Sequence, residues 1–270
     1  MTRPIFVVDA FASGPFRGNP AAVVLLEPDD APAGSWMLSV AAEMKHSETA
    51  YVQPRPGGDF GLRWFTPEVE VDLCGHATLA SAHVLWEAGR LDPDSSAVFQ
   101  TRGGELRATR PHEGAVQLDF PTAPPDPCDA PAGLLDALGI EKAESLCTTG
   151  QFFMFVVANA ATVRTVTPDF AAMRALSDVR GVYVTAAGDD GVHDIVSRCF
   201  APRVGIDEDP VTGSMHCVLA PYWCERLGLR ELFAEQASER GGTMHARLDG
   251  DRTLLTGDAV TVLRGSLLFP

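Results

Sequence analysis

The sequence predicts an α+β fold of two similar halves, in each of which many short strands surround one central helix. Three observations carry this prediction. Short strand-like runs recur along the whole chain. Two segments, 75–89 and the one that begins near 213, have apolar residues at helical spacing on nearly all sides, as helices buried inside a domain do. The residues that precede these two helices also resemble each other.

That resemblance lies between "FTPEVEVDLCGHAT" at 65–78 and "FAPRVGIDEDPVTGSMH" at 200–216. Each stretch gives Phe-x-Pro-x-Val, a short acidic loop, a glycine and then a buried helix. The matched glycines are Gly75 and Gly213. A repeat of this length suggests two copies of one architecture within the chain.

The elements of the first half follow from alternation, helical spacing and Gly/Pro breaks. The loop 12–20 separates the first two strands, and one amphipathic helix precedes the third. The predicted strands are 4–11, 21–27, 48–52, 60–65, 96–101, 105–110 and 115–120, and the predicted helices are 35–44 and 75–89.

The second half begins after 121–133, where five prolines in thirteen residues make the best linker candidate. The plan of the first half then repeats. The predicted strands are 152–158, 181–186, 193–200, 232–238, 244–248, 253–257 and 259–267, with helices at 168–176 and from about 213.

Composition limits the classes of function. The chain has 270 residues, 46% of them hydrophobic, and a formal net charge of -15. This charge argues against nucleic acid and anionic membranes as partners, because both need a basic face. No apolar run approaches the ~20 residues of a membrane span, and the start of the chain does not read as a signal peptide.

Six scattered cysteines without a CxxC pair indicate reduced thiols and a cytoplasmic protein. Zinc ligands usually occur at tighter spacing, so no metal is expected, although the possible ligands are Cys74 with His76, His216 with Cys217, and His83.

The two helix starts are the first candidate site. The first N–H groups of a helix lack internal partners, and the helix dipole adds partial positive charge there. Gly75 and Gly213 would let a ligand approach the backbone, and His76 and Ser214 follow them directly. If both starts faced one cleft, it would bind a carboxylate. The alternative is ordinary capping, in which Asp72 or Asp209 satisfies its own helix.

Glu48 is the second candidate, because it shares a strand face with Ala50 and Val52. An unpaired acid on an apolar face has a raised pKa, which suits a general base working near neutrality. A salt bridge or a solvated acid at the strand end would explain the same pattern. Asn19 could bind a substrate, although a turn residue is the simpler interpretation.

These motifs together resemble the phenazine-biosynthesis PhzF-like family, in the diaminopimelate-epimerase-like superfamily. The stretches that carry the resemblance are 9–24, 47–52, 65–85, 208–216 and 259–267, in order along the chain. The resemblance implies two pseudo-symmetric halves, 1–125 with 259–270 packing back on it, and 126–258. It also implies an active site in the cleft between them, a homodimer, and no metal or organic cofactor.

The resemblance also assigns roles. Glu48 matches the family's catalytic base, while His76 and Asp209 match residues that bind the substrate and assist. Gly75, Gly213 and Ser214 match the cradle for the substrate carboxylate, and Asn19 is retained as a further substrate-binding candidate. These roles imply a cofactor-independent isomerase that moves a proton on a small carboxylate-bearing metabolite, such as a dihydro-hydroxyanthranilate-like compound.

Two alternatives stay open: an amino-acid epimerase or racemase, and a non-catalytic protein that binds small carboxylates. Diaminopimelate epimerase uses one cysteine from each half. Here Cys74 stands at the first such position, but Thr212 stands at the second. The pKa of a hydroxyl is far above that of a thiol, so racemisation by two thiols is disfavoured. Cys74 is then expected to be structural, with a reactive low-pKa thiol as the alternative.

Overall fold

The computed structural model describes residues 2–268, which divide into two compact units. The first unit contains 2–120 and 255–268, and the second contains 121–254. Within the described residues, no helix has both the length and the apolar character that crossing a membrane requires.

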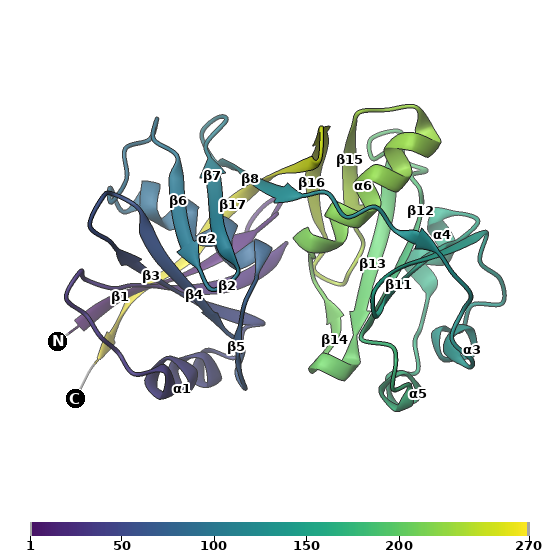
Figure 1. The fold of residues 1–270 in the computed structure, drawn as a ribbon, viewed down its shortest axis with the longest axis horizontal. Coiled ribbons are helices and arrows are strands. Elements are labelled where there is room, and N and C mark those ends of the chain that lie inside the picture. The colour runs from purple at the N-terminus through teal and green to yellow at the C-terminus, as the bar shows by residue number, and fades with distance from the viewer. Residues whose placement is uncertain (1, 269–270) are drawn as a thin grey trace. The chain divides into compact units, whose positions relative to one another are not determined.

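The strands of the first unit close into a barrel around helix α2 (Figure 1). Hydrogen-bonded neighbours follow the order β1-β2-β3-β4-β6-β7-β8-β17, and β17 pairs again with β1. Helix α2 is buried nearly all round, as its sequence predicts. The elements are β1 (Thr2–Ala10), β2 (Asn19–Leu25), α1 (Gly34–Met44), β3 (Glu48–Pro54), β4 (Phe60–Phe65), β5 (Glu70–Val71), α2 (Gly75–Glu87), β6 (Ala97–Thr101), β7 (Gly104–Thr109), β8 (Ala115–Pro121) and β17 (Arg252–Leu268).

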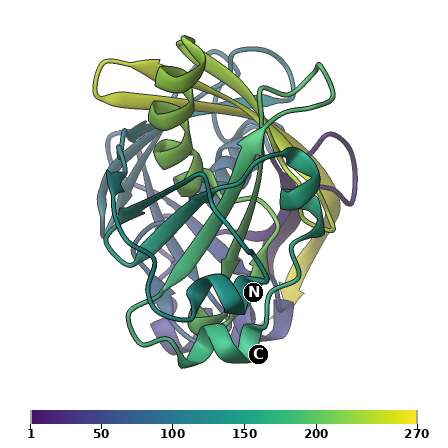
Figure 2. The same ribbon diagram turned by 90° about the vertical axis from the view of Figure 1, so that its right-hand side faces the viewer.

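The second unit wraps a curved sheet around helix α6, which Figure 2 shows from a second side. The order is β9-β10-β11-β12-β13-β15-β16, and β14 pairs with β13. The elements are β9 (Asp126–Pro127), α3 (Leu134–Leu138), β10 (Ser145–Thr149), β11 (Phe152–Val156), α4 (Ala160–Thr165), α5 (Phe170–Ala175), β12 (Gly181–Ala187), β13 (Ile195–Ala201), η1 (Pro202–Val204), β14 (Ile206–Asp209), α6 (Gly213–Leu227), β15 (Glu231–Gln236) and β16 (Gly242–Asp249).

The two units repeat one pattern of strand pairing, which confirms the predicted similarity of the halves. In the first, β1/β2 is antiparallel, β2/β3 parallel, β3/β4 antiparallel, β4/β6 parallel and β6/β7 antiparallel. In the second, the same alternation runs through β10/β11, β11/β12, β12/β13, β13/β15 and β15/β16. Each central helix follows a short strand, β5 or β14. The chain therefore has a diaminopimelate-epimerase-like α+β fold.

The pairing registers give residue-by-residue equivalences between the units. Phe65 lies opposite Thr49, and Phe200 opposite Val182, so β3 and β12 align with Glu48 matching Gly181. The same procedure aligns β5 with β14, because Trp64 pairs with Val71 and Cys199 pairs with Asp209. Val71 is thus equivalent to Asp209. Counting onward along the chain gives the further equivalent pairs Cys74 and Thr212, Gly75 and Gly213, His76 and Ser214, and Thr78 and His216.

The structure differs from the sequence predictions mainly in its short elements. The predicted strands 253–257 and 259–267 form the single long strand β17, since Asp258 continues the strand instead of breaking it. Sequence patterns also miss the two-residue strands β5 and β9, which are too short to show alternation. Both are fixed by their neighbours β4 and β10.

Candidate active site

The first unit brings Glu48 and His76 together inside the barrel. Glu48 begins β3, and His76 is the second residue of α2. His76 Nε2 lies 3.3 Å from Glu48 Oε2, and the two side chains are 7% and 12% exposed. Ala50 and Val52, which follow Glu48 on the same strand face, are fully buried. The acid therefore lies on an apolar face, as the alternation predicts, with an imidazole beside it.

Hydrogen bonding fixes the proton position on His76. The side-chain amide nitrogen of Asn19 lies 3.2 Å from His76 Nδ1, and an amide nitrogen can only donate. Nδ1 is therefore the acceptor, and the neutral ring carries its proton on Nε2, the atom that faces Glu48. Burial, and secondarily the charge of His46, lowers the pKa of His76 to about 3. The contact with Glu48 thus involves a neutral imidazole rather than an ion pair.

Asn19 is held in place by a glycine that no other residue could replace without strain. Gly18 has φ +66°, and a Cβ there would lie 2.2 Å from the carbonyl oxygen of Ala10. The chain can thus turn tightly into β2 and place Asn19, which is fully buried, against the imidazole. Gly18 therefore makes the turn, and Asn19 belongs to the site.

Cys74 also contacts His76, and with Glu48 it makes a possible metal-ligand set. Its Sγ lies 3.5 Å from Nδ1, whereas Glu48 approaches Nε2. One ligand atom from each of the three residues lies within 4.8 Å of the others. Catalytic zinc uses three protein ligands and structural zinc four, so the set reaches the number of a catalytic site but not of a structural one.

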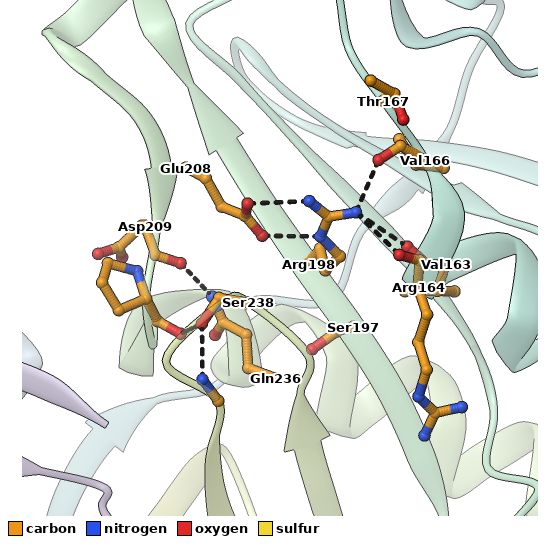
Figure 3. A network of polar contacts seen from close by, with 12 residues as sticks. Val163, Arg164, Val166, Thr167, Ser197, Arg198, Glu208, Asp209, Gln236 and Ser238 are labelled. Carbon is orange, nitrogen blue, oxygen red and sulfur yellow. Dashed lines mark hydrogen bonds and ion pairs between the residues drawn. The ribbon is translucent and has the colours of Figure 1, made fainter. Parts of the chain in front are cut away.

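In the second unit, Asp209 ends β14 in a network of hydrogen bonds. Thr212 Oγ1 donates to Asp209 Oδ2 at 2.5 Å. The side chain of the buried Gln236 makes two hydrogen bonds to the backbone of this loop. Its Nε2 donates to the Asp209 carbonyl at 2.8 Å (Figure 3). Its Oε1 accepts from the Thr212 N–H at 2.7 Å. Ser238 donates to the carbonyl of Pro210 at 2.8 Å. The carboxylate therefore sits on a fixed loop.

An arginine–glutamate pair anchors the strand before each helix start. Arg198 binds Glu208 through two hydrogen bonds of 2.7 and 2.9 Å (Figure 3), and Arg63 binds Glu70 through two of 2.7 and 2.8 Å. Each guanidinium also lies over the phenylalanine two residues later, at 4.8 and 5.1 Å from the ring centroid. These paired bonds fix β14 and β5 next to the candidate residues.

In each helix, the side chain three positions after the first glycine donates a hydrogen bond to the carbonyl of the residue before that glycine. Thr78 Oγ1 donates to the Cys74 carbonyl at 2.6 Å, and His216 Nδ1 donates to the Thr212 carbonyl at 2.9 Å. Neither N-cap residue, Cys74 or Thr212, caps its own helix through its side chain, and within residues 2–268 neither first turn contains an acid. The capping alternative for Asp72 therefore fails, since 76% of that side chain is exposed and it lies 3.9 Å from Arg102.

The structure gathers the predicted residues into two groups, one in each unit. Glu48, His76, Asn19 and Gly75 belong to the first group. Asp209, Gly213 and Ser214 belong to the second, with Gly213 buried and Ser214 exposed. Sequence analysis missed Gln236, although it follows Leu232 and Ala234 on the buried face of β15. A polar residue at an apolar position was the available signal.

Comparison with known proteins identifies the family. The sequence model described as phenazine biosynthesis-like protein matches residues 8–265. An uncharacterised isomerase of Halalkalibacterium halodurans is 45% identical over 273 residues, which cover all of both chains. The chain therefore belongs to the phenazine biosynthesis-like (PhzF) family.

Solved structures agree with this assignment. A PhzF-family phenazine biosynthesis protein from Enterococcus faecalis is 40% identical, covers both chains completely and superposes with a TM-score of 0.92. A probable proline racemase from Agrobacterium radiobacter, 14% identical with a TM-score of 0.65, covers 99% of this chain and 93% of its own. At that identity the likeness shows a shared fold only.

Proposed function

We propose that this protein is a cofactor-independent isomerase that moves a proton on a small carboxylate-bearing metabolite. The pairing of Glu48 with the neutral imidazole of His76 carries the proposal. A carboxylate that is largely withdrawn from water is a stronger base than a solvated one, and it lies within reach of a single N–H donor. The relatives' names as isomerases support the same class of reaction.

In the proposed reaction, Glu48 takes a proton from a carbon next to the electron-withdrawing part of the substrate. The electron pair left on carbon shifts along the substrate, and the proton returns to a different carbon, so substrate and product have the same atoms. The Nε2–H of His76 donates a hydrogen bond to the substrate, and the protonated Glu48 returns the proton. We assign orientation of the substrate to Asp209, and carboxylate binding to Gly75, Gly213 and Ser214, on the family resemblance.

Racemisation by two thiols gains no support from the second unit. Thr212 stands where a second cysteine would be needed, and its hydroxyl donates to Asp209 instead of accepting a proton. Burial raises the pKa values of the nearby Cys199 and Cys217, the latter to about 12. These thiols are protonated at neutral pH and do not act as bases.

Deuterium uptake tests the proposal. The protein is incubated in heavy water with dihydro-3-hydroxyanthranilate and a panel of small amino and hydroxy acids, and mass spectrometry measures uptake at carbon. We expect uptake into one compound by the wild type and a loss of at least about 100-fold in Glu48→Gln. Glu43→Gln, the same change at an exposed position on α1, should behave as the wild type.

Equal uptake by Glu48→Gln and the wild type would remove Glu48 from the mechanism. The absence of uptake into every compound would favour a binding protein over an isomerase. Inversion at the exchanging carbon, without migration of a double bond, would instead identify an epimerase.

A further inference from the structure

The first unit has a cavity away from Glu48, on the side of the sheet that α1 covers. Its volume is about 570 Å³, which lies within the range of small-molecule sites. Met37 of α1 and Tyr51 of β3 form its apolar wall, where the Tyr51 hydroxyl donates to the Met37 carbonyl at 2.6 Å. Glu48 is on the opposite face of β3 from Tyr51, so the cavity is separate from the candidate active site.

Three arginines line this cavity: Arg55, Arg63 and Arg102. The one acid that lines it is Asp30, within the described residues. Arg3 already binds Asp30 through two hydrogen bonds, which hold the pKa of this carboxyl below its ordinary value. The lining is thus basic in a protein whose formal net charge is -15.

The neighbouring acids pair with only some of the N–H donors of these arginines. Arg63 and Arg102 share the single carboxylate of Glu70, at 2.7 and 2.9 Å. The remaining pairs are long: Arg102 lies 3.9 Å from Asp72, and Arg55 lies 3.7 Å from Asp59. Exposed ion pairs of this length contribute little, so they would compete weakly with a bound anion.

Comparison with the second unit shows what is different at this place. Arg198, the equivalent of Arg63, uses Nη1 to donate to carbonyl groups at the end of α4, the nearest being Val166 at 2.7 Å (Figure 3). Arg63 donates to Glu70 through Nε and Nη2, and its Nη1 has no acceptor among residues 2–268. Where the second unit has helix carbonyls, the first has a cavity with two further arginines.

We propose that this cavity binds a small polyanion, a metabolite with two or more closely spaced negative charges on phosphate or carboxylate groups. Guanidinium groups bind both kinds of oxyanion through paired hydrogen bonds. Gln53 and Thr101 add polar lining, although Gln53 donates to the carbonyls of Glu27, Pro28 and Asp30 and so fixes the rim. The proposal does not depend on the reaction proposed above.

Isothermal titration calorimetry at low ionic strength tests it, with pyrophosphate and citrate as probes and acetate as the monoanion. We expect at least one polyanion to bind, with an affinity at least about tenfold above that of acetate. Arg55→Gln/Arg102→Gln should lower this affinity by about tenfold or more, because each removes one charged donor. A stronger response to pyrophosphate or to citrate tells phosphate from carboxylate ligands.

Arg107→Gln is the matched control, because it removes the same charge from an exposed arginine on β7 that pairs with Glu105 outside the cavity. It should bind the polyanion as the wild type does. The single variants Arg55→Gln and Arg102→Gln, at side chains 50% and 60% exposed, should fold normally and each lower the affinity. Equal weakening in Arg107→Gln, unchanged binding in the double variant, or no polyanion binding by the wild type would overturn the proposal.

Discussion

The two units share a scaffold but carry their acids at positions that are not equivalent. Glu48 of the first unit corresponds to Gly181 of the second, and Asp209 of the second corresponds to Val71 of the first. The arginine–glutamate anchors and the carbonyl-holding side chains, in contrast, occur in both. The repeated hydrogen bonds therefore fix the geometry of both helix starts. The acids, which are not repeated, make the two helix starts chemically different.

Gly181 stands at the position of the second unit that is equivalent to Glu48. A Cβ at this position would lie 2.5 Å from a ring carbon of Phe152, so the second unit has no room for an acid where the first has Glu48. Phe152 stacks on Tyr183 at 5.4 Å between ring centroids, and this stack fills the space. We infer that proton transfer belongs to the first unit.

The largest expected effect comes from reversing the tautomer of His76. Asn19→Asp replaces the amide donor at Nδ1 with a carboxylate, which favours a proton on Nδ1 and leaves Nε2 as an acceptor toward Glu48. We expect the ¹⁵N NMR shifts of the two ring nitrogens to exchange character, and deuterium uptake to fall by about 100-fold. Asn159→Asp, at a helix cap in the second unit, is the control that should alter neither.

Retention of a protonated Nε2 in Asn19→Asp would show that Asn19 does not set the tautomer.

The next effect concerns the loop that carries Asp209. Gln236→Leu removes three hydrogen bonds, two to half-buried backbone groups and one to Thr212 Oγ1, which should cost about 2–4 kcal/mol in the free energy of unfolding. Gln117→Leu, at a half-buried glutamine with one bond to Thr256, should cost less than about 1 kcal/mol. Chemical denaturation compares the two, and similar losses would contradict the special role of Gln236.

The last prediction concerns how stability depends on pH. Burial lowers the pKa values of His76 to about 3 and of His83 and His216 to about 4. Between these values and about 6.5, the unfolded chain binds protons that the folded chain does not. Stability contributed by neutral histidines is therefore complete above pH 6.5 and is lost as the pH falls toward 4, by up to about 1.4 kcal/mol per histidine for each pH unit.

His216→Asn separates this effect from the titration of carboxylates. The asparagine amide can still donate to the Thr212 carbonyl, but it does not titrate. Unfolding midpoints measured from pH 7 to pH 4 should fall less steeply in this variant than in the wild type. His112→Asn, at an exposed histidine, should leave the slope unchanged, and a His216→Asn slope equal to the wild type's would contradict the assignment.

Much of the scaffold could be predicted from the sequence, because alternation and buried-helix patterns are local. Phe-x-Pro-x-Val before each glycine also exposed the repeat. The pairing of Glu48 with His76 could not be found by spacing, since it joins β3 to α2 through the barrel. The family resemblance supplied both residues, and the structure adds Asn19 as the residue that orients the ring.

The anchors show what a closer comparison of the halves would have found. Arg63 and Arg198 stand two residues before the matched phenylalanines, and Glu70 and Glu208 each stand five residues before the matched glycines. Counted from the phenylalanines, the glutamates stand five and eight residues later, because the loop before the second glutamate is three residues longer. Counting the arginines from the phenylalanines and the glutamates from the glycines therefore matches the two pairs, and the strand registers agree.

The most direct measurement of the central claim compares Glu48→Gln with Asp209→Asn in solvent deuterium exchange, with the compound that the wild type labels. If proton transfer belongs to the first unit, Glu48→Gln loses exchange by at least about 100-fold in kcat, while Asp209→Asn raises KM and keeps measurable exchange at saturating substrate. The reverse result, with exchange abolished in Asp209→Asn and retained in Glu48→Gln, would place the base in the second unit and contradict the account.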